Sequence, residues 1–451
     1  MISDTIVAPA TPYGIGGIAV VRLSGPQSLL IANKLINNNK LRVVFKPRQA
    51  TLVNLQDETG AAIDESIITF FQSPNSYTGE DLIEISCHGN PIVVDNIISN
   101  CCRLGAHIAE PGEFTKRAFI NGKMDLVQAE AVTSLIHSQS AESSQLNLRI
   151  LHGELSQKLN DIRKNLVHAV SIVEFELDIS EERLQPDLNN QLLSMINNLV
   201  QKISKLLESY KQARMLNHGA TVVIAGAPNV GKSTLLNALT ETDRAITSTS
   251  PGTTRDAIDV RLVLDGVPIN LIDTAGIRNS TEEIEQKGIN KTFNYLKKAD
   301  LIIIVRDPGL MDTPSIMAPE NIPTIEIMNK SDLLSDSQSK HLKRAHPERI
   351  FLSAKTGDNI HLLKQQAKIS LGVGGSLSDT VTTTTSRQHN ALKDCHNKLN
   401  AATELLNSPR CAYELIAIEL RDALDAVGVI LGKTTPDDIL NNIFNQFCVG
   451  K

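Results

Sequence analysis

The sequence predicts a multidomain chain with an α+β N-terminal domain, a helical domain, and a doubly wound α/β domain inserted into the helices. Apolar strands alternate with amphipathic stretches over residues 1–120. Helical patterns run over residues 121–218, and again over residues 373–451. Between them, residues 219–372 alternate buried strands with helices, which is typical of a parallel sheet. Neither helical block can bury its apolar stripe alone, so we expect the two blocks to pack together.

The composition is that of an ordinary globular protein, with 41% hydrophobic and 21% charged residues. The formal net charge of −6 gives no global basic signature, so contact with nucleic acid requires a local patch. Six scattered cysteines without zinc-binding spacing fit a reducing cytosol, and we expect a cytoplasmic location. No membrane span and no secretory leader are expected, because no apolar run has the necessary length.

The N-terminal domain mixes short strands and helices. Strands are expected at residues 5–8, 17–23, 50–55, 66–71 and 81–87, and helices at 28–36 and 92–104. Three charges stand out: Arg22 and Glu84 within strands, and Lys123 in a turn before a helix. Taken singly, each is interpreted as a solvated charge. The neighbours Cys87 and His88 do not provide a base facing a nucleophile.

A phosphate-binding loop opens the inserted domain. The apolar run 222–225 precedes Gly-Ala-Pro-Asn-Val-Gly-Lys-Ser at 226–233, and a helical segment follows. A strand, a glycine-bounded loop and a helix in this order form the P-loop pattern. Lys232 can reach the β- and γ-phosphates, and the Ser233 hydroxyl can bind Mg²⁺. The residues expected to contact the nucleotide here are Asn229, Val230, Gly231, Lys232, Ser233 and Thr234.

Two downstream segments have the pattern of loops that sense the nucleotide. The first is the polar loop at residues 248–254, whose terminal threonine, Thr254, can supply a second hydroxyl to Mg²⁺. A predicted hairpin, with strands at 259–264 and 268–273, then leads into the second, where an Asp orders Mg²⁺ through water and a Gly senses the γ-phosphate. The nucleotide contacts expected here are Ser248, Thr249, Ser250, Pro251, Gly252, Thr253 and Thr254, then Asp273, Thr274, Ala275 and Gly276.

Two later motifs predict the base. Strands are expected at 301–305 and 325–328, and the second leads into Asn329-Lys330-Ser331-Asp332. The two oxygens of Asp332 match two donors on a guanine edge, which argues for GTP and against an ATP-dependent kinase. The Lys330 stem can cover the base. A strand at 350–352 ends in Ser353, Ala354 and Lys355, whose backbone can bind the guanine oxygen.

The expected catalytic residue of hydrolysis is not the usual one. Where Ras-like GTPases carry a Gln that orients the attacking water, this chain has Ile277. The following segment offers Glu282, Glu283 and Glu285, any of which could act through a bridging water. A side-chain carbonyl at Asn229 could hold a monovalent cation between the phosphates.

The motifs GAPNVGKST, PGTTRD, DTAGIR, NKSD and SAK resemble the TrmE-Era-Der group of GTPases. Outside the inserted domain, SYTGEDLIEISCHGNP, PGEFTKRAFINGKMDLVQAEAV and the terminal FCVGK resemble its MnmE (TrmE) family of tRNA uridine-modification GTPases. This resemblance covers essentially the whole chain. The alternative is a regulatory switch of the Era or Der type that binds RNA or the ribosome. Those proteins carry a compact RNA-binding domain after the GTPase, whereas this chain ends in Cys-Val-Gly-Lys.

The resemblance implies a potassium-activated GTP hydrolase that binds K⁺ and Mg²⁺. K⁺ ligands fall at Asn229, Ser248, Ser250 and Thr253, and Mg²⁺ ligands at Ser233 and Thr254. Ser248 and Ser250 stand where well-known members have Thr and Ile. Neither change affects the expected K⁺ site much if residue 248 contributes its hydroxyl and residue 250 its backbone carbonyl. Of the three glutamates, Glu285 matches the residue that positions water.

The resemblance also implies a folate-binding N-terminal domain that mediates formation of a homodimer. The positions that match folate contacts are Arg22, Glu84, Lys123 and Lys451, with 5-formyltetrahydrofolate or a related one-carbon folate as cofactor. Cys448 matches a cysteine that the modification needs. The family works with an FAD-containing partner, MnmG, in a heterotetramer or larger complex. Together they add a carboxymethylaminomethyl or aminomethyl group to C5 of the wobble uridine of certain tRNAs.

Overall fold

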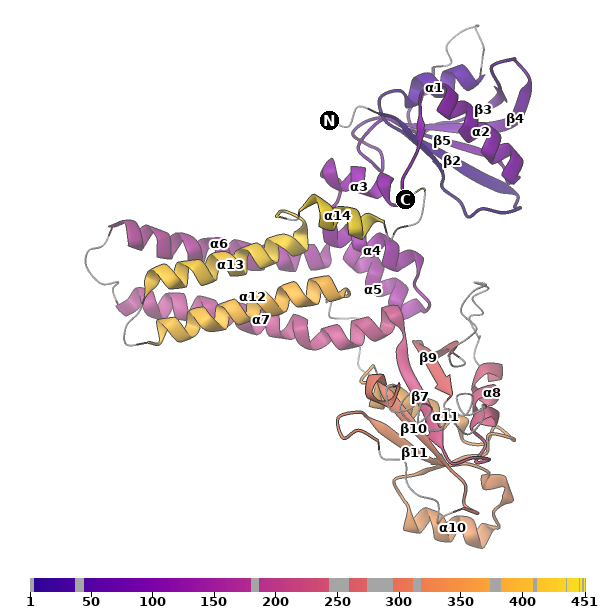
Figure 1. Cartoon of the computed structure of the whole chain (residues 1–451), viewed down its shortest axis with the longest axis vertical. Coiled ribbons are helices and arrows are strands. Elements are labelled where there is room, and N and C mark those ends of the chain that lie inside the picture. The colour runs from indigo at the N-terminus through magenta and orange to yellow at the C-terminus, as the bar shows by residue number, and fades with distance from the viewer. Residues whose placement is uncertain are drawn as a thin grey trace, which may run out of the picture. The chain divides into compact units, whose positions relative to one another are not determined.

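The computed structural model describes residues 4–36, 44–179, 186–242, 259–273, 295–310, 318–373, 383–408, 412–434, 436–445, 447 and 450 (Figure 1). The chain forms two compact units. The first comprises Met1–Thr133, Ile150–His168 and Arg421–Lys451. The second comprises Ser134–Arg149 and Ala169–Leu420. No helix within the described residues is long and apolar enough to cross a membrane.

A six-stranded sheet forms the N-terminal domain in the order β3-β4-β5-β2-β1-β6. Its neighbours are antiparallel except β1 and β6, which run parallel. The strands are β1 (Ile6–Pro9), β2 (Ile18–Ser24), β3 (Ala50–Gln56), β4 (Ala62–Phe71), β5 (Leu82–His88) and β6 (His107–Ile108). The first five confirm the predicted strands, although β4 begins earlier than its apolar run because it includes Asp64 and Glu65.

The helices α1 (Ser28–Ile36) and α2 (Pro91–Arg103) pack against this sheet and confirm the predicted helices. Alternate strand residues fill one core with them, among them Val21, Leu23 and Ile85. The intervening residues of β2 and β5, including the cross-strand partners Arg22 and Glu84, lie on the opposite face of the sheet. That face therefore carries two of the three charges that the sequence analysis singled out.

Helices occupy both blocks expected from the sequence, and one further helix, at residues 113–120, precedes the first block. They are α3 (Glu113–Ile120), α4 (Leu126–Ile136), α5 (Ala141–Leu151), α6 (Glu154–Ile179), α7 (Pro186–His218), α12 (Ser386–Leu406), α13 (Tyr413–Leu431) and α14 (Asp437–Phe444). α7 and α12 pack along each other, with the rings of Tyr210 and His389 stacked 4.1 Å apart. The prediction that residues before and after the insertion pack together is confirmed for this pair.

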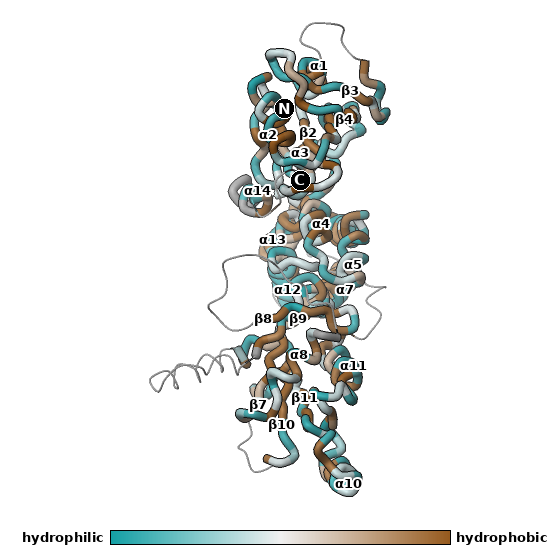
Figure 2. The backbone as a smooth tube through the Cα atoms, turned by 90° about the vertical axis from the view of Figure 1, so that its right-hand side faces the viewer, coloured by the Kyte–Doolittle hydropathy of each residue, from teal (hydrophilic) through white to brown (hydrophobic). Residues whose placement is uncertain are grey.

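The inserted domain contains a second sheet, in the order β12-β11-β10-β7-β9-β8. All neighbours are parallel except β8 and β9, which form the predicted hairpin. The strands are β7 (Ala220–Gly226), β8 (Asp259–Leu264), β9 (Val267–Asp273), β10 (Leu301–Arg306), β11 (Thr324–Met328) and β12 (Ile350–Phe351). The strands β7 and β10 are nearly continuous hydrophobic segments (Figure 2), as expected for buried parallel strands.

Within the described residues of this domain, helices follow its motifs. They are α8 (Lys232–Thr242), α10 (Asp336–Ala345) and α11 (Ile360–Ser370), with a short 3₁₀ turn at Ser331–Leu333. Together with the parallel strands they form the doubly wound α/β fold that the sequence predicted.

A buried arginine joins three segments of the first unit. The Arg117 side chain is only 1% exposed. Its guanidinium donates to Asp4 Oδ1 at 3.0 Å and to Glu113 Oε1 at 2.8 Å, and it contacts Glu80 Oε2 at 3.3 Å. It therefore connects the segment before β1, the loop before β5, and α3. Removing the arginine would leave the charges of these carboxylates without a compensating cation.

We predict that Arg117→Met destabilises this region by about 3–5 kcal/mol, because three carboxylates lose their shared cation. Amide hydrogen exchange in β1 and α3 of the full chain should then be at least about a hundredfold faster. Arg103→Met, an exposed position at the end of α2, is the control and should leave exchange unchanged. Equal exchange in the two variants would contradict a stabilising role for Arg117.

Candidate functional site

The P-loop has a geometry that only its own glycines permit. A side chain at Gly226 would collide with the Val305 carbonyl of the neighbouring strand β10. Gly231 has a φ of +94°, and a Cβ there would collide with the Asn329 amide. Asn229, at φ 62°, also takes a left-handed conformation. The loop is therefore shaped by close approaches to β10 and to Asn329.

Lys232 and Ser233 stand at the start of α8, where the free N–H groups of a helix N-terminus attract anions. Lys232 is 7% exposed. Its Nζ donates to the carbonyls of Gly226 at 3.1 Å and Ala227 at 2.7 Å. The loop thus holds a cation and a helix N-terminus together, which is the arrangement that binds phosphate.

Asn329 connects three motifs that are distant in sequence. Its side-chain Nδ2 donates to the Val230 carbonyl at 2.9 Å, and its Oδ1 accepts from the Ala354 N–H at 2.9 Å. It is 2% exposed. The P-loop, the Asn-Lys-Ser-Asp segment and the Ser-Ala-Lys segment therefore meet at one amide, as the sequence-based site requires. The Ala354 N–H, one of the donors expected for guanine, binds Asn329 in this structure.

The residues expected to read guanine lie beside this amide. Asp332 accepts a hydrogen bond from Ser353 Oγ at 2.6 Å, which orients its carboxylate. Lys330, in the left-handed region at φ 59°, donates from Nζ to the Asn229 carbonyl at 2.8 Å and to Asp307 at 2.7 Å. Its stem therefore runs from the base-reading loop to the P-loop. Lys355 follows in the adjoining turn.

The other predicted nucleotide contacts fall mostly outside the described residues. The Asp273 backbone ends β9, opposite Ile224 of the P-loop strand, so the strand end does reach the P-loop side of the sheet. The residues outside are Ser248, Thr249, Ser250, Pro251, Gly252, Thr253, Thr254, Thr274, Ala275, Gly276, Ile277, Glu282, Glu283, Glu285, Cys448 and Lys451. Of the expected K⁺ and Mg²⁺ ligands, the structure describes Asn229 and Ser233.

A second group of candidate site residues lies on the face of the N-terminal sheet opposite α1 and α2. Arg22 donates from Nε and Nη2 to Glu84 Oε1, at 3.0 and 2.7 Å. The guanidinium also lies 5.5 Å from the Tyr77 ring centre and 5.7 Å from that of Phe114. The interpretation of Arg22 as a solvated charge is wrong, because its side chain is 13% exposed and is paired. Tyr77 and Phe114 were not predicted; their only sequence signal was an aromatic residue within two motifs.

The end of the chain reaches this site. Arg22 Nη1 donates to the Gly450 carbonyl at 3.2 Å, although the two residues are 428 positions apart. Gly450 has a φ of 89° and approaches the Pro9 carbonyl so closely that a Cβ would not fit. α14 packs on the same unit, with Phe444 between Phe119 and Phe447. Sequence reasoning alone, without the family resemblance, could not have paired Arg22 with the C-terminus.

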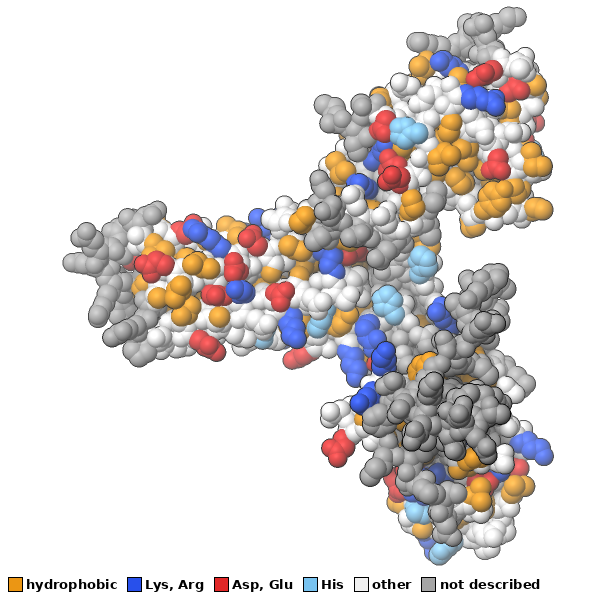
Figure 3. Space-filling view, viewed as in Figure 1, with side chains coloured by type: hydrophobic (Ala, Val, Ile, Leu, Met, Phe, Trp, Pro, Cys, Tyr) orange, Lys and Arg blue, Asp and Glu red, His pale blue; other side chains and the backbone are white. Residues whose placement is uncertain are grey.

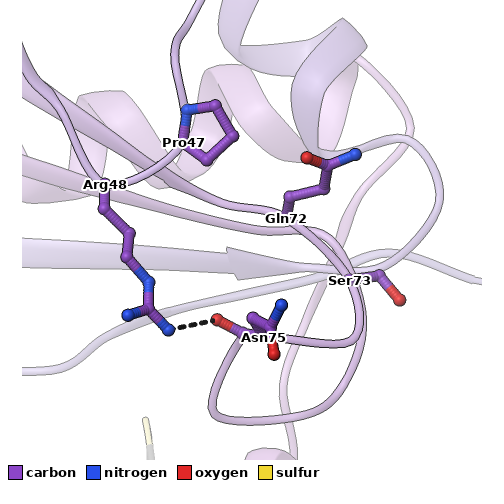
Figure 4. A pocket seen from close by; sticks show the side chains of 5 residues that line it. All are labelled: Pro47, Arg48, Gln72, Ser73 and Asn75. Carbon is purple, nitrogen blue, oxygen red and sulfur yellow. Dashed lines mark hydrogen bonds between the residues drawn. The ribbon is translucent and has the colours of Figure 1, made fainter.

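Lys123 lies in the turn between α3 and α4 and contacts the loop that precedes β5. Its Nζ donates to the Pro74 carbonyl at 2.9 Å, and its stem passes Gly79. The same loop carries Tyr77, which contacts Arg22, so Lys123 connects to the site through this loop. Beside Pro74 lies a small polar cavity of about 340 Å³ (Figure 4). It is lined by Pro47, Arg48, Gln72, Ser73 and Asn75, with Arg48 donating to the Asn75 carbonyl.

Cys87 and His88 do not form a catalytic pair. Burial raises the pKa of the Cys87 thiol to about 11, and the thiol faces the Ala19 carbonyl. The His88 Nδ1 instead contacts Asp64 at 2.7 Å. The sequence-based interpretation of these neighbours is thus supported.

A P-loop joined through the Asn329 amide to the Asn-Lys-Ser-Asp and Ser-Ala-Lys segments defines a P-loop GTPase. Family models match as "GTP-binding protein TrmE N-terminus" over residues 5–123 and "MnmE helical domain" over residues 126–448. The tRNA modification GTPase MnmE of Chlorobium chlorochromatii is 38% identical over 99% of this chain and 98% of its own length. That of Mannheimia succiniciproducens is 37% identical over 100% of both. The chain therefore belongs to the MnmE family of tRNA modification GTPases and is a GTP-hydrolysing enzyme.

We predict that Asp332→Asn weakens GTP binding by about ten- to hundredfold, since hydrogen bonds to a charged acceptor contribute about 1.5–3 kcal/mol. The amide offers a donor where the carboxylate accepted, so affinity for a xanthosine nucleotide should rise. Both affinities can be measured by nucleotide titration. Asp336→Asn, the exposed acid in the first turn of α10, is the control. Unchanged GTP affinity in Asp332→Asn would remove this residue from the base-reading site.

Proposed function

We propose that this enzyme is a potassium-activated GTPase that, with an FAD-containing MnmG-type partner, modifies tRNA at the wobble uridine. The product carries a carboxymethylaminomethyl or aminomethyl group at C5 of that base. The observation that best supports this proposal is the contact of the Gly450 carbonyl with Arg22, within the Arg22–Glu84 pair. It brings Gly450, a residue of the terminal Cys-Val-Gly-Lys motif, to Arg22, which matches a folate contact.

In this proposal Arg22, Glu84, Lys123 and Lys451 hold 5-formyltetrahydrofolate or a related one-carbon folate. The described residues fit such a ligand: a guanidinium and a carboxylate offer complementary donors and acceptors to a heterocycle, and two aromatic rings flank them. When bound, the folate supplies the one-carbon unit. Arg22 and Glu84 orient it, and Cys448, two residues before Gly450, acts on the substrate nearby.

For hydrolysis, we assign Mg²⁺ to Ser233 and Thr254, and K⁺ to Asn229, Ser248, Ser250 and Thr253. Glu285 positions the attacking water, in place of the glutamine that Ile277 replaces. Asn229, one of the proposed ligands that the structure describes, fits this assignment. Asn229 is held by the hydrogen bond from Lys330 to its backbone carbonyl, which leaves its side-chain oxygen available as a hard donor of the type these cations prefer. A bound K⁺ would supply positive charge beside the phosphates.

A homodimer through the N-terminal domain is part of the proposal. The segment before β2 contacts the turn before α2, where the Gly16 N–H donates to the Gly89 carbonyl at 2.9 Å, and four large apolar side chains lie within three residues of these two glycines. They are Tyr13, Ile15, Ile18 and Ile92, and each is 69–96% exposed. An apolar cluster of this kind on one domain supports an interface with a second copy. A cytoplasmic location follows from the tRNA substrate.

We predict that GTP turnover is at least tenfold faster in K⁺ than in Na⁺, which corresponds to about 1.4 kcal/mol of barrier. The physical reason is that the smaller ion fits the proposed oxygen cage less well. Steady-state phosphate release in matched chloride salts measures it. Asn229→Ala should bind GTP yet lose the preference for K⁺. Equal turnover of the unsubstituted enzyme in the two salts would exclude a K⁺-specific site.

We predict that Cys448→Ser abolishes tRNA modification while GTP hydrolysis continues at its normal rate, because the thiol acts in the one-carbon site and not at the P-loop. Nucleoside mass spectrometry of tRNA from cells that carry the variant as their only copy measures the modification. Cys102→Ser, a partly buried thiol on α2, is the matched control and should retain both activities. Loss of both activities in Cys448→Ser would indicate a structural role instead.

A further inference from the structure

The helix α10 is formed without burying any of its own residues. None of the side chains in Asp336–Ala345 is buried. Its ends carry the stabilising features: a capping box joins Ser335 and Gln338, Asp336 lies in the first turn, and Lys343 and Arg344 lie in the last. Most helices in proteins are stabilised by packing an apolar face. The helix α10 is instead stabilised by its caps and its terminal charges. Its exposed surface is therefore free to contact other molecules.

That surface is basic. Lys340, Lys343 and Arg344 are spaced three and four residues apart, which places them on one side of the helix. His341 lies between them and His346 caps the helix, whereas the single acid, Asp336, is at the opposite end. α10 lies at one end of the inserted domain in both backbone views (Figures 1 and 2), and Lys, Arg and His side chains appear at that end (Figure 3).

The acidic groups near the end of α10 already have partners. Glu348 contacts His346 at 3.7 Å and Arg349 at 3.5 Å. Glu326, on β11, binds Arg306 at 3.1 Å and Arg349 at 2.8 Å. Lys343 lies 6.0 Å from the centre of the Phe351 ring. In the part of the chain that the structure describes, no carboxylate pairs with Lys340 or Arg344. These two cations are available to an external anion.

We propose that α10 is a contact surface for the phosphate backbone of tRNA. The family acts on tRNA, yet the chain has a net charge of −6, so electrostatic attraction must come from a local basic surface. Lys340 and Arg344 provide one, on a rigid helix one turn apart. Contacts of this kind position an RNA without reading its sequence. The inference depends on family membership and on neither the folate nor the K⁺ assignment.

The test compares two variants of the full-length chain that lose the same charge. Lys340→Gln/Arg344→Gln removes the two free cations of α10, and Lys202→Gln/Lys205→Gln removes two exposed lysines of α7. The probe is a fluorescently labelled, unmodified tRNA transcript, and its affinity is measured by anisotropy at several salt concentrations. Circular dichroism and the basal GTPase rate, measured without tRNA, show that both variants are folded.

The α10 variant should bind tRNA at least about fivefold more weakly than the α7 variant. Its plot of log affinity against log salt should lose a slope of about 1.4–1.8, because each lost phosphate contact removes about 0.7–0.9. An affinity and slope equal to those of the α7 variant would overturn the proposal, as would an unsubstituted chain whose tRNA binding does not depend on salt. Unchanged tRNA binding with weakened binding of the FAD-containing partner would also overturn it, and would assign α10 to a protein contact.

Discussion

The side-chain amide of Asn329 is the interaction on which the nucleotide site depends. One of its atoms donates to the P-loop and another accepts from the Ser-Ala-Lys turn, so a single planar group sets the spacing between the phosphate and base halves of the site. The same amide explains why residue 231 is glycine, since a Cβ there would occupy its place. Lys330 adds a parallel connection from the base loop to Asn229.

The N-terminal domain uses two arginines in different ways. Arg117 is buried among three carboxylates and joins segments of the fold. Arg22 is paired with one carboxylate, is flanked by aromatic rings, and has a side chain that is 13% exposed, on the face of the sheet opposite α1 and α2. Its remaining bond goes to the backbone of Gly450. This difference separates a stabilising ion network from the site proposed for folate, beside which the Gly450 carbonyl lies.

Most strands and helices could be predicted because their apolar periodicity is local. The runs that became β7 and β10 are buried on both faces and are continuously apolar, and α1 has the predicted bounds. The helix α3 and the short strand β6 were not predicted. α3 has eight residues, and one of its buried positions is Arg117, so its inward face does not look apolar in the sequence. β6 has two residues and exists only through pairing with β1.

The sequence alone was enough to identify the nucleotide class and the family. The P-loop and the base-reading motifs are each formed by a few consecutive residues, so they can be recognised without knowing which distant residues they contact. The tertiary structure decided what is brought together. Arg22 and Gly450 are 428 positions apart, and Arg117 and Asp4 are 113 apart, so no periodicity could relate them. The exposure of α10 was also decided there, since a charged sequence shows a helix's chemistry but not whether the fold covers it.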